Sequence, residues 1–178
     1  DGALAEFEAA GSYEDAPERI LATHYAYAEA LLSEGDYDGA VSQFEAAGSY
    51  SDAAQRILQT RYAQAEALLA AGDIDNALAK FSLLGDYEDA VERVCEIHYT
   101  QAEQLLAAGD TDGALAEFAL AGNYQDAPER IQAIHYARAE ELLAAGDNDG
   151  AATAFEAAGD YEDAPERAQA IRFAPAEA

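Results

Sequence analysis

The side chains best able to do chemistry recur at one position, every 37 residues along the chain. This cationic column consists of His24, Arg61, His98, His135 and Arg172. No second histidine or carboxylate lies four residues from any of these histidines, which argues against a metal site on one helix. The column could grip an acidic or aromatic ligand, or form a pH-sensitive contact between layers. Our preferred interpretation is that it neutralises carboxylates on neighbouring helices.

Five more arginines share a second recurring position. They are Arg19, Arg56, Arg93, Arg130 and Arg167, and they accompany Glu29, Glu66, Glu103, Glu140 and Glu177. Because the chain holds only 9 lysines and arginines, five at one position indicate a structural role. A planar guanidinium can bridge two acidic partners, so we expect each arginine to pin the nearby turn or an adjacent carboxylate.

Other arrangements that could carry catalytic or metal chemistry are weak. Asp147–Gly150 superficially resembles a calcium loop, but Ala145 occupies an earlier ligand position, so we interpret it as a turn with a helix cap. The spacing sets up no Ser–His–Asp or Cys–His arrangement and no glycine-rich phosphate loop. Cys95 stands in an apolar column, so we expect a buried, inert thiol. The sequence therefore predicts no enzyme activity, no cofactor and no metal site.

The composition excludes some partners. The 178 residues include 36 acidic side chains against 9 basic ones, a formal charge of −27, yet 51% are hydrophobic, too many for a disordered chain. So few cations argue against nucleic acid, and no apolar run approaches the roughly 20 residues that span a bilayer. The compartment stays open, and an extracellular or cell-surface location is compatible with this composition.

A unit of 37 residues recurs five times along the chain. Gly11-x-Tyr13 and the later turn Gly35-Asp36 both recur at that interval. Between the turns, apolar residues fall three and four apart, as on one face of a helix, and no stretch alternates as a strand does. A long helix and a short one of about ten residues cannot bury their apolar stripes alone and must stack on neighbouring pairs.

We therefore predict an all-α solenoid that forms a single domain over residues 1–178. Its units are 1–37, 38–74, 75–111, 112–148 and the truncated 149–178. An aspartate such as Asp52 opens each long helix, and we expect its carboxylate to cap the free amides there. The same role is expected at the short helices of Asp38, Asp75, Asp112 and Asp149. Pro17, Pro128 and Pro165 fall in a first turn, where a missing N–H is harmless.

The short-helix half of each unit resembles the tetratricopeptide repeat. Gly35–Phe44 and Gly72–Phe81 match that repeat's Gly-Asp-x-x-x-x-Ala-x-x-x-Phe spacing. The chain is most similar to bacterial tetratricopeptide-like repeats that carry a Gly-Asp-Tyr-x-Asp-Ala turn, as in Gly85–Ala90, although its period is longer than the usual 34 residues. The resemblance implies stacked helix-turn-helix units and a non-enzymatic scaffold whose groove binds a protein or peptide.

Residues that break the repeat are where a solenoid would encode a partner. We therefore predict a partner-binding surface that combines four such residues with part of the cationic column. Its members are Tyr27, Gln64, Gln101, Arg138, His24, Arg61, His98 and His135.

The two ends of the chain are complementary in register, which offers an alternative function. Head-to-tail stacking of copies would bury both ends and build a filament. The predicted contact residues are Ala3, Leu4, Phe7, Ile171 and Phe173. The sequence thus leaves two functions open, a scaffold for protein–protein interaction and a structural solenoid that assembles with itself.

Overall fold

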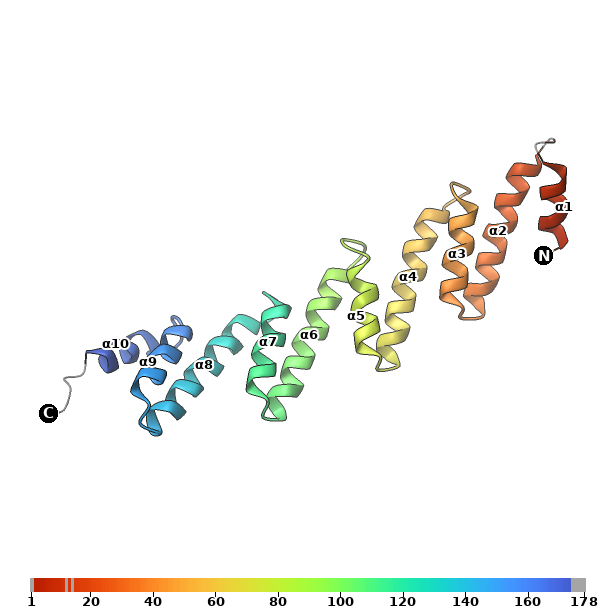
Figure 1. Ribbon diagram of the computed structural model, residues 1–178. Helices are drawn as coiled ribbons and strands as arrows, with labels where there is room; N and C mark the ends of the chain where they lie inside the picture. Colours follow the sequence, from red (N-terminus) through yellow and green to blue (C-terminus); the bar gives the residue numbers. More distant parts are fainter. Residues whose placement is uncertain (1, 12, 14, 174–178) are drawn as a thin grey trace. The chain divides into compact units, whose positions relative to one another are not determined.

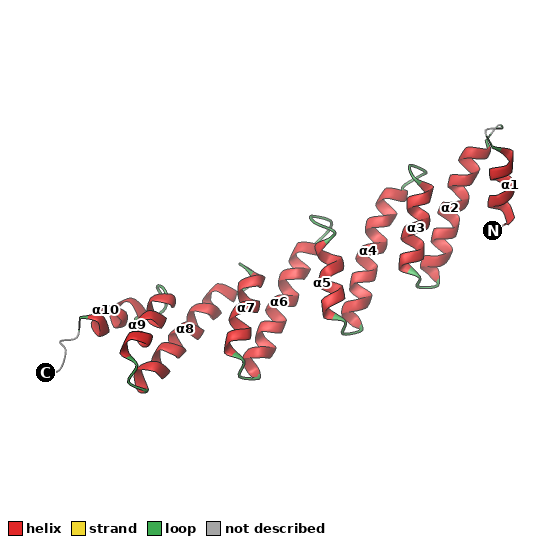
Figure 2. Cartoon of the chain, in the orientation of Figure 1, coloured by secondary structure: helices red, strands yellow, loops and turns green. Residues whose placement is uncertain are grey.

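The computed structural model describes residues 2–11, 13 and 15–173, apart from the side chains of residues 3, 4, 8 and 10. Within these residues the chain forms ten α-helices and no strand (Figure 2). The predicted all-α class is confirmed. In Figure 1 the helices follow one another as pairs joined by tight turns, a longer helix alternating with a shorter one.

The long helices begin 37 residues apart, as do the short helices from α3 onward, in phase with the sequence repeat. The long helices, four of them with 18 residues, are α2 (Ala16–Ser33), α4 (Ala53–Ala70), α6 (Ala90–Ala107), α8 (Ala127–Ala144) and the shorter α10 (Ala164–Arg172). The short helices are α1 (Gly2–Ala10), α3 (Tyr37–Ala47), α5 (Ile74–Ser82), α7 (Thr111–Ala121) and α9 (Asn148–Ala157). The predicted helix-turn-helix unit is therefore confirmed.

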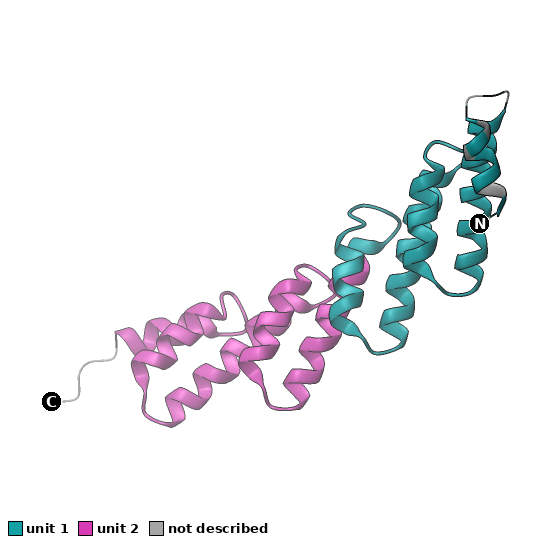
Figure 3. Cartoon of the chain, turned by 45° about the vertical axis from the view of Figure 1, so that its right-hand side comes forward, with its two compact units in different colours: residues 1–91 teal, residues 92–178 magenta. Residues whose placement is uncertain are grey.

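The chain divides into two compact units, residues 1–91 and residues 92–178, with the boundary inside α6 (Figure 3). In the first unit each helix from α1 to α5 packs against the next one in the sequence. In the second unit α7, α8, α9 and α10 pack in the same consecutive way. The extent of a single domain over residues 1–178 stays a prediction.

We call a long helix and the short helix that follows it a layer. From α2–α3 to α8–α9, the core of each layer contains one completely buried phenylalanine together with buried alanines. Phe118 of α7 is completely buried, and Ala102 of α6 and Ala114 of α7 are buried in the same cluster. The rings of Phe118 and Tyr99 meet in a T-shaped arrangement at a centroid distance of 5.4 Å, a favourable aromatic geometry. The same buried phenylalanine recurs at Phe44, Phe81 and Phe155. Small alanines let the helices approach closely, while the aromatic rings fill the remaining space.

The turn from a long helix to a short one combines two helix-end motifs. Gly109 has a φ of 83°, and the next amide, of Asp110, donates back to the carbonyl of Leu105 at 2.9 Å. The Asp110 carboxylate then accepts the amide of Gly113 at 3.0 Å and so caps α7. The capping residue is therefore the aspartate directly after the glycine. Our assignment of this role to Asp38, Asp75, Asp112 and Asp149 is wrong, because each of them already lies inside the first turn of its short helix.

The start of each long helix also differs from the prediction. The prolines Pro17, Pro128 and Pro165 do lie in the first turn, as expected. Asp52 and its described equivalents at α2, α8 and α10 make no capping hydrogen bond, however. These carboxylates bind side chains instead, as described below.

The expectation of a buried thiol is also wrong, because Cys95 of α6 is only half-buried.

The short-to-long turns hold a non-glycine residue in the left-handed region of the backbone. Ser51, Glu88, Gln125 and Glu162 have φ values of 49° to 52°. A side chain there costs roughly 1–2 kcal/mol, because its Cβ crowds the following carbonyl. We expect Gln125→Gly to raise the free energy of unfolding by about 0.5–1 kcal/mol, measured by chemical denaturation. Gln104→Gly, at an exposed site inside α6, should lower it by a similar amount, and stabilisation by both variants would contradict this account.

Candidate functional site

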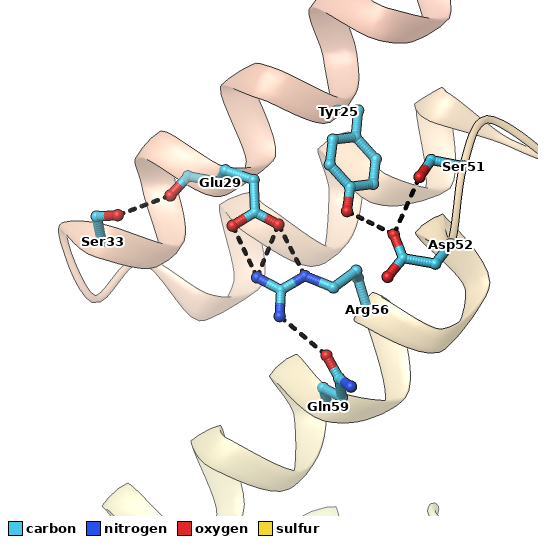
Figure 4. Close-up of polar contacts among 7 residues, drawn as sticks. All are labelled: Tyr25, Glu29, Ser33, Ser51, Asp52, Arg56 and Gln59. Atoms are coloured by element: carbon cyan, nitrogen blue, oxygen red, sulfur yellow. Dashed lines mark hydrogen bonds and ion pairs between the residues drawn. The ribbon is translucent and has the colours of Figure 1, made fainter.

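The recurring arginines join successive long helices through carboxylates. Figure 4 shows Arg56 of α4 against Glu29 of α2, with Nε donating to Oε1 and Nη2 to Oε2, both at 2.7 Å. Arg130 lies 3.5 Å from Glu103 and 3.0 Å from Asp126, so it bridges two acidic partners. Arg167 of α10 pairs with Glu140 of α8. The expectation that these arginines pin adjacent carboxylates is confirmed for these three.

Two of these guanidinium groups also cover core phenylalanines. The Cζ atom of Arg56 lies 5.5 Å from the ring centre of Phe44, and that of Arg167 lies 4.7 Å from the ring centre of Phe155. A cation over an aromatic face is attracted by the ring quadrupole. Each of these arginines therefore ties a long helix to both helices of the preceding layer, which is a structural role.

The aspartates that open the long helices accept hydrogen bonds from tyrosines 27 residues earlier. Tyr25 Oη donates to Asp52 Oδ1 at 2.5 Å, as drawn in Figure 4, and Tyr99 donates to Asp126. The bond holds the pKa of Asp126 below its ordinary value and, with burial, raises the pKa of Tyr99. A Tyr–Asp contact of this kind recurs for Tyr62 with Asp89 and for Tyr136 with Asp163.

This contact predicts a dependence of stability on pH at both extremes. Because the pKa of Tyr99 is raised on folding, its contribution is complete below the unfolded value of about 10 and is lost as the pH rises through the folded value. Because the pKa of Asp126 is lowered, its contribution is present above its unfolded value and is lost as the pH falls through the folded one. We expect the Tyr99 Cζ resonance, followed by carbon-13 NMR, to titrate at lower pH in Asp126→Asn. An unchanged titration would contradict the assignment.

The cationic column lies against the short helices. His24 Nδ1 is 2.8 Å from Gln43 Oε1, His98 Nδ1 is 2.7 Å from Glu117 Oε2, and Arg61 donates to Glu45 at 2.9 Å. Arg172 forms two bonds with Glu156. For His135, burial and the neighbouring charge of Arg138 lower the pKa. The contacts of Arg61, His98 and Arg172 fit the interpretation that the column neutralises nearby carboxylates, whereas His24 contacts an amide and no carboxylate contact is shown for His135. Ligand binding by the column stays a prediction.

The four residues that break the repeat share one repeat position but differ in their contacts. They are Tyr27, Gln64, Gln101 and Arg138. Gln64 donates to Asp38 at 3.0 Å, and Arg138 donates to Asp112 at 2.9 Å, so both contact the first turn of the preceding short helix. Tyr27 is 46% exposed, while Gln101 is half-buried. Two of the four are therefore already hydrogen-bonded within the chain, and the role of all four in binding a partner stays a prediction.

The structure brings Arg61 and Gln64 together in one groove of the first compact unit. The groove has a volume of about 440 Å³, and three helices line it. Its residues are Asp38, Val41 and Ser42 of α3, Arg61 and Gln64 of α4, Lys80 of α5, and Leu83 directly after α5. Arg138 lies in a separate groove of the second unit, of about 430 Å³, between α8 and the turn that leads into α7. The predicted surface residues thus line at least two grooves.

Comparison with protein families identifies the repeat. A family model described as the tetratricopeptide repeat matches residues 21–46, 58–79, 96–127 and 132–157. Each match spans most of a long helix and most or all of the short helix that follows it. The four matches together cover more than half of the chain. The chain belongs to the tetratricopeptide repeat family. A search of curated proteins finds no significant match.

Membership of the tetratricopeptide repeat family accounts for the all-α solenoid of helix pairs. Tetratricopeptide repeats typically mediate binding between proteins and are generally non-enzymatic scaffolds. Among the described residues of this tetratricopeptide protein, no group of three or more His, Cys, Asp or Glu side chains could hold a metal ion. In the same part of the chain, no helix is long and apolar enough to cross a membrane.

The residues predicted for head-to-tail contact lie at the first and last described tetratricopeptide units. The side chains of Ala3 and Leu4 fall outside the described residues. Phe7 is half-buried beneath Arg19, whose Cζ atom is 5.8 Å from the ring centre. Ile171 packs against the buried cluster of α9 and α10, whereas Phe173 is 78% exposed. Their proposed role as a contact between copies stays a prediction.

Proposed function

We propose that this protein is a non-enzymatic scaffold that binds a segment of another protein on its tetratricopeptide repeats. The observation that carries the proposal is the family match over four helix pairs. The groove of about 440 Å³ supports it, because the groove is open to a partner and is lined by apolar as well as polar side chains. Sites that bind ligands combine apolar lining with a few polar groups that fix orientation.

A random peptide library displayed on phage tests this proposal. Selection against the immobilised chain should enrich related sequences, and synthetic versions of them should bind with dissociation constants near the micromolar range in a fluorescence anisotropy titration. An immobilised acidic protein without repeats serves as the control for adsorption by charge. Failure to enrich any sequence over that control would overturn the proposal.

Self-association is the second candidate, and the exposed ring of Phe173 is the observation that favours it. The ring is 78% exposed, so covering it with a second copy would remove apolar surface from water and favour association. Sedimentation velocity over a wide range of concentrations should then show larger species for the chain than for Phe173→Ser. Monomers at every concentration would overturn this candidate without affecting the scaffold.

A further inference from the structure

The cations of this protein are all occupied. The 9 lysine and arginine side chains each form an ion pair with a carboxylate of the same chain. The acidic side chains number 36, so most of them have no cation to pair with. In residues 1–91, which contain the groove of α3, α4 and α5, 18 acidic residues stand against 4 basic ones. A partner that approaches this unit therefore meets a negative potential.

The two cations in the groove do not reverse this potential locally. Arg61 is held by Glu45 at 2.9 Å, and Lys80 lies 3.3 Å from Asp38. An acidic partner would have to displace a carboxylate that is already in place, against the charge of the whole unit. A basic partner meets no unpaired cation among the lining residues of the groove.

Asp38 offers such a partner an oxygen. Gln64 and Lys80 both donate to Oδ1, and Oδ2 accepts no hydrogen bond from the part of the chain that the structure describes. The side chain of Asp38 is 79% exposed. These two donors also hold its pKa below the ordinary value, so the carboxylate is charged at neutral pH. A lysine or arginine of a partner can therefore pair with Oδ2.

The groove also presents apolar surface beside that carboxylate. Leu83 is 77% exposed, and the same repeat position holds Leu120 in the second unit but alanine at Ala46 and Ala157. Val41 is half-buried on the facing helix α3 and lines the same groove. Val41 and Leu83 therefore give the groove an apolar part beside its polar groups, the combination that ligand-binding sites use.

We infer that the groove between α3 and α5 binds a basic segment of a partner protein, with an apolar side chain against Val41 and Leu83 and a lysine or arginine on Asp38. This inference rests on the proposed scaffold function and names its partner class. The apolar contact positions the segment, whereas complementary charge speeds association and rejects acidic competitors. Binding should weaken as salt is added, because the pairing involves exposed charges.

Three fluorescein-labelled peptides of about 15 residues test the inference by anisotropy. They share one pattern of leucines, and their charged positions are all lysine, all glutamate or all glutamine. The lysine peptide should bind at least about tenfold more tightly than the glutamate peptide at low salt, with the glutamine peptide between them. Tighter binding of the glutamate peptide would overturn the inference.

Two pairs of variants locate the site, with the fold of each checked by circular dichroism. Leu83→Ala and Asp38→Asn should each weaken the lysine peptide several-fold, up to about tenfold. Leu120→Ala and Asp112→Asn change the equivalent positions of the second unit, where Leu120 is 58% exposed, and should leave the affinity unchanged. Equal weakening by both pairs would mean adsorption by charge and would overturn the inference.

The outcomes separate this inference from the proposed function. If the phage library yields binders that are acidic, or that bind Leu83→Ala as well as the original chain, the groove assignment fails while the scaffold function stands. If the library yields no binders, the scaffold function fails, and the assignment of a basic partner fails with it.

Discussion

Phe118→Ala is expected to lower the free energy of unfolding by about 3–5 kcal/mol. The ring is completely buried among Ala102, Ala114 and Ile134 and meets Tyr99 in a T-shaped arrangement. Its removal leaves a cavity whose fully buried neighbours are mostly alanines, and their short side chains cannot move in to fill it. The loss therefore includes both the transfer of the ring and the cost of the cavity. Urea or guanidinium unfolding, followed by circular dichroism, measures the effect.

Two further substitutions in α7 give this experiment its control. Phe118→Leu keeps most of the buried volume and should lose clearly less than the alanine variant. Leu120→Ala, two residues away but 58% exposed, should change the free energy of unfolding by no more than about 0.5 kcal/mol. Equal losses for Phe118→Ala and Leu120→Ala would contradict the central place of the phenylalanine.

Ala102→Leu is expected to destabilise the protein by about 1–3 kcal/mol through overpacking. Ala102 is completely buried on α6 and belongs to the same cluster as Ala114 and Phe118 of α7. A leucine in its place must push the two helices apart or force neighbouring side chains out of their preferred rotamers. A fall in the midpoint of thermal unfolding reports the effect.

An exposed alanine of the same helix separates packing from helix propensity. Ala107→Leu substitutes the same residue type near the end of α6, where the side chain is exposed. Alanine and leucine differ little in helix propensity, so this variant should unfold close to the original midpoint. A stable Ala102→Leu protein would show that the layers can separate without loss, and that the alanine column is not needed for close approach.

The sequence predicted the helices well because their signals are local. Apolar spacing, prolines in first turns and the Gly-Asp and Gly-x-Tyr turns act within a few residues, and the observed helices follow them with the predicted period. Because an arginine recurs at the same position in every unit, the sequence also predicted a structural role for Arg56 and its equivalents. A phenylalanine recurs at one repeat position, as at Phe44 and Phe118, because its ring fills the same space between the packed helices each time.

The assignment of each carboxylate required the tertiary structure. Asp126 follows the pattern of a helix cap, yet its carboxylate accepts the hydroxyl of Tyr99, which the packing of the preceding long helix delivers. Asp112 also follows that pattern, yet the turn at Gly109 places Asp110 at the cap, while Asp112 pairs with Arg138. Sequence spacing cannot decide between a local amide and a donor 26 or 27 residues away.

The candidate groove shows the same division. The sequence singled out Arg61 and Gln64 because of their repeat positions, but it could not show that Leu83 is exposed beside them or that Asp38 has an oxygen to spare. The sequence by itself determined the repeat, the helices and the excess of negative charge. Only the tertiary structure decided which charges are paired and which apolar side chains stay exposed, because both depend on contacts between helices that are distant in the chain.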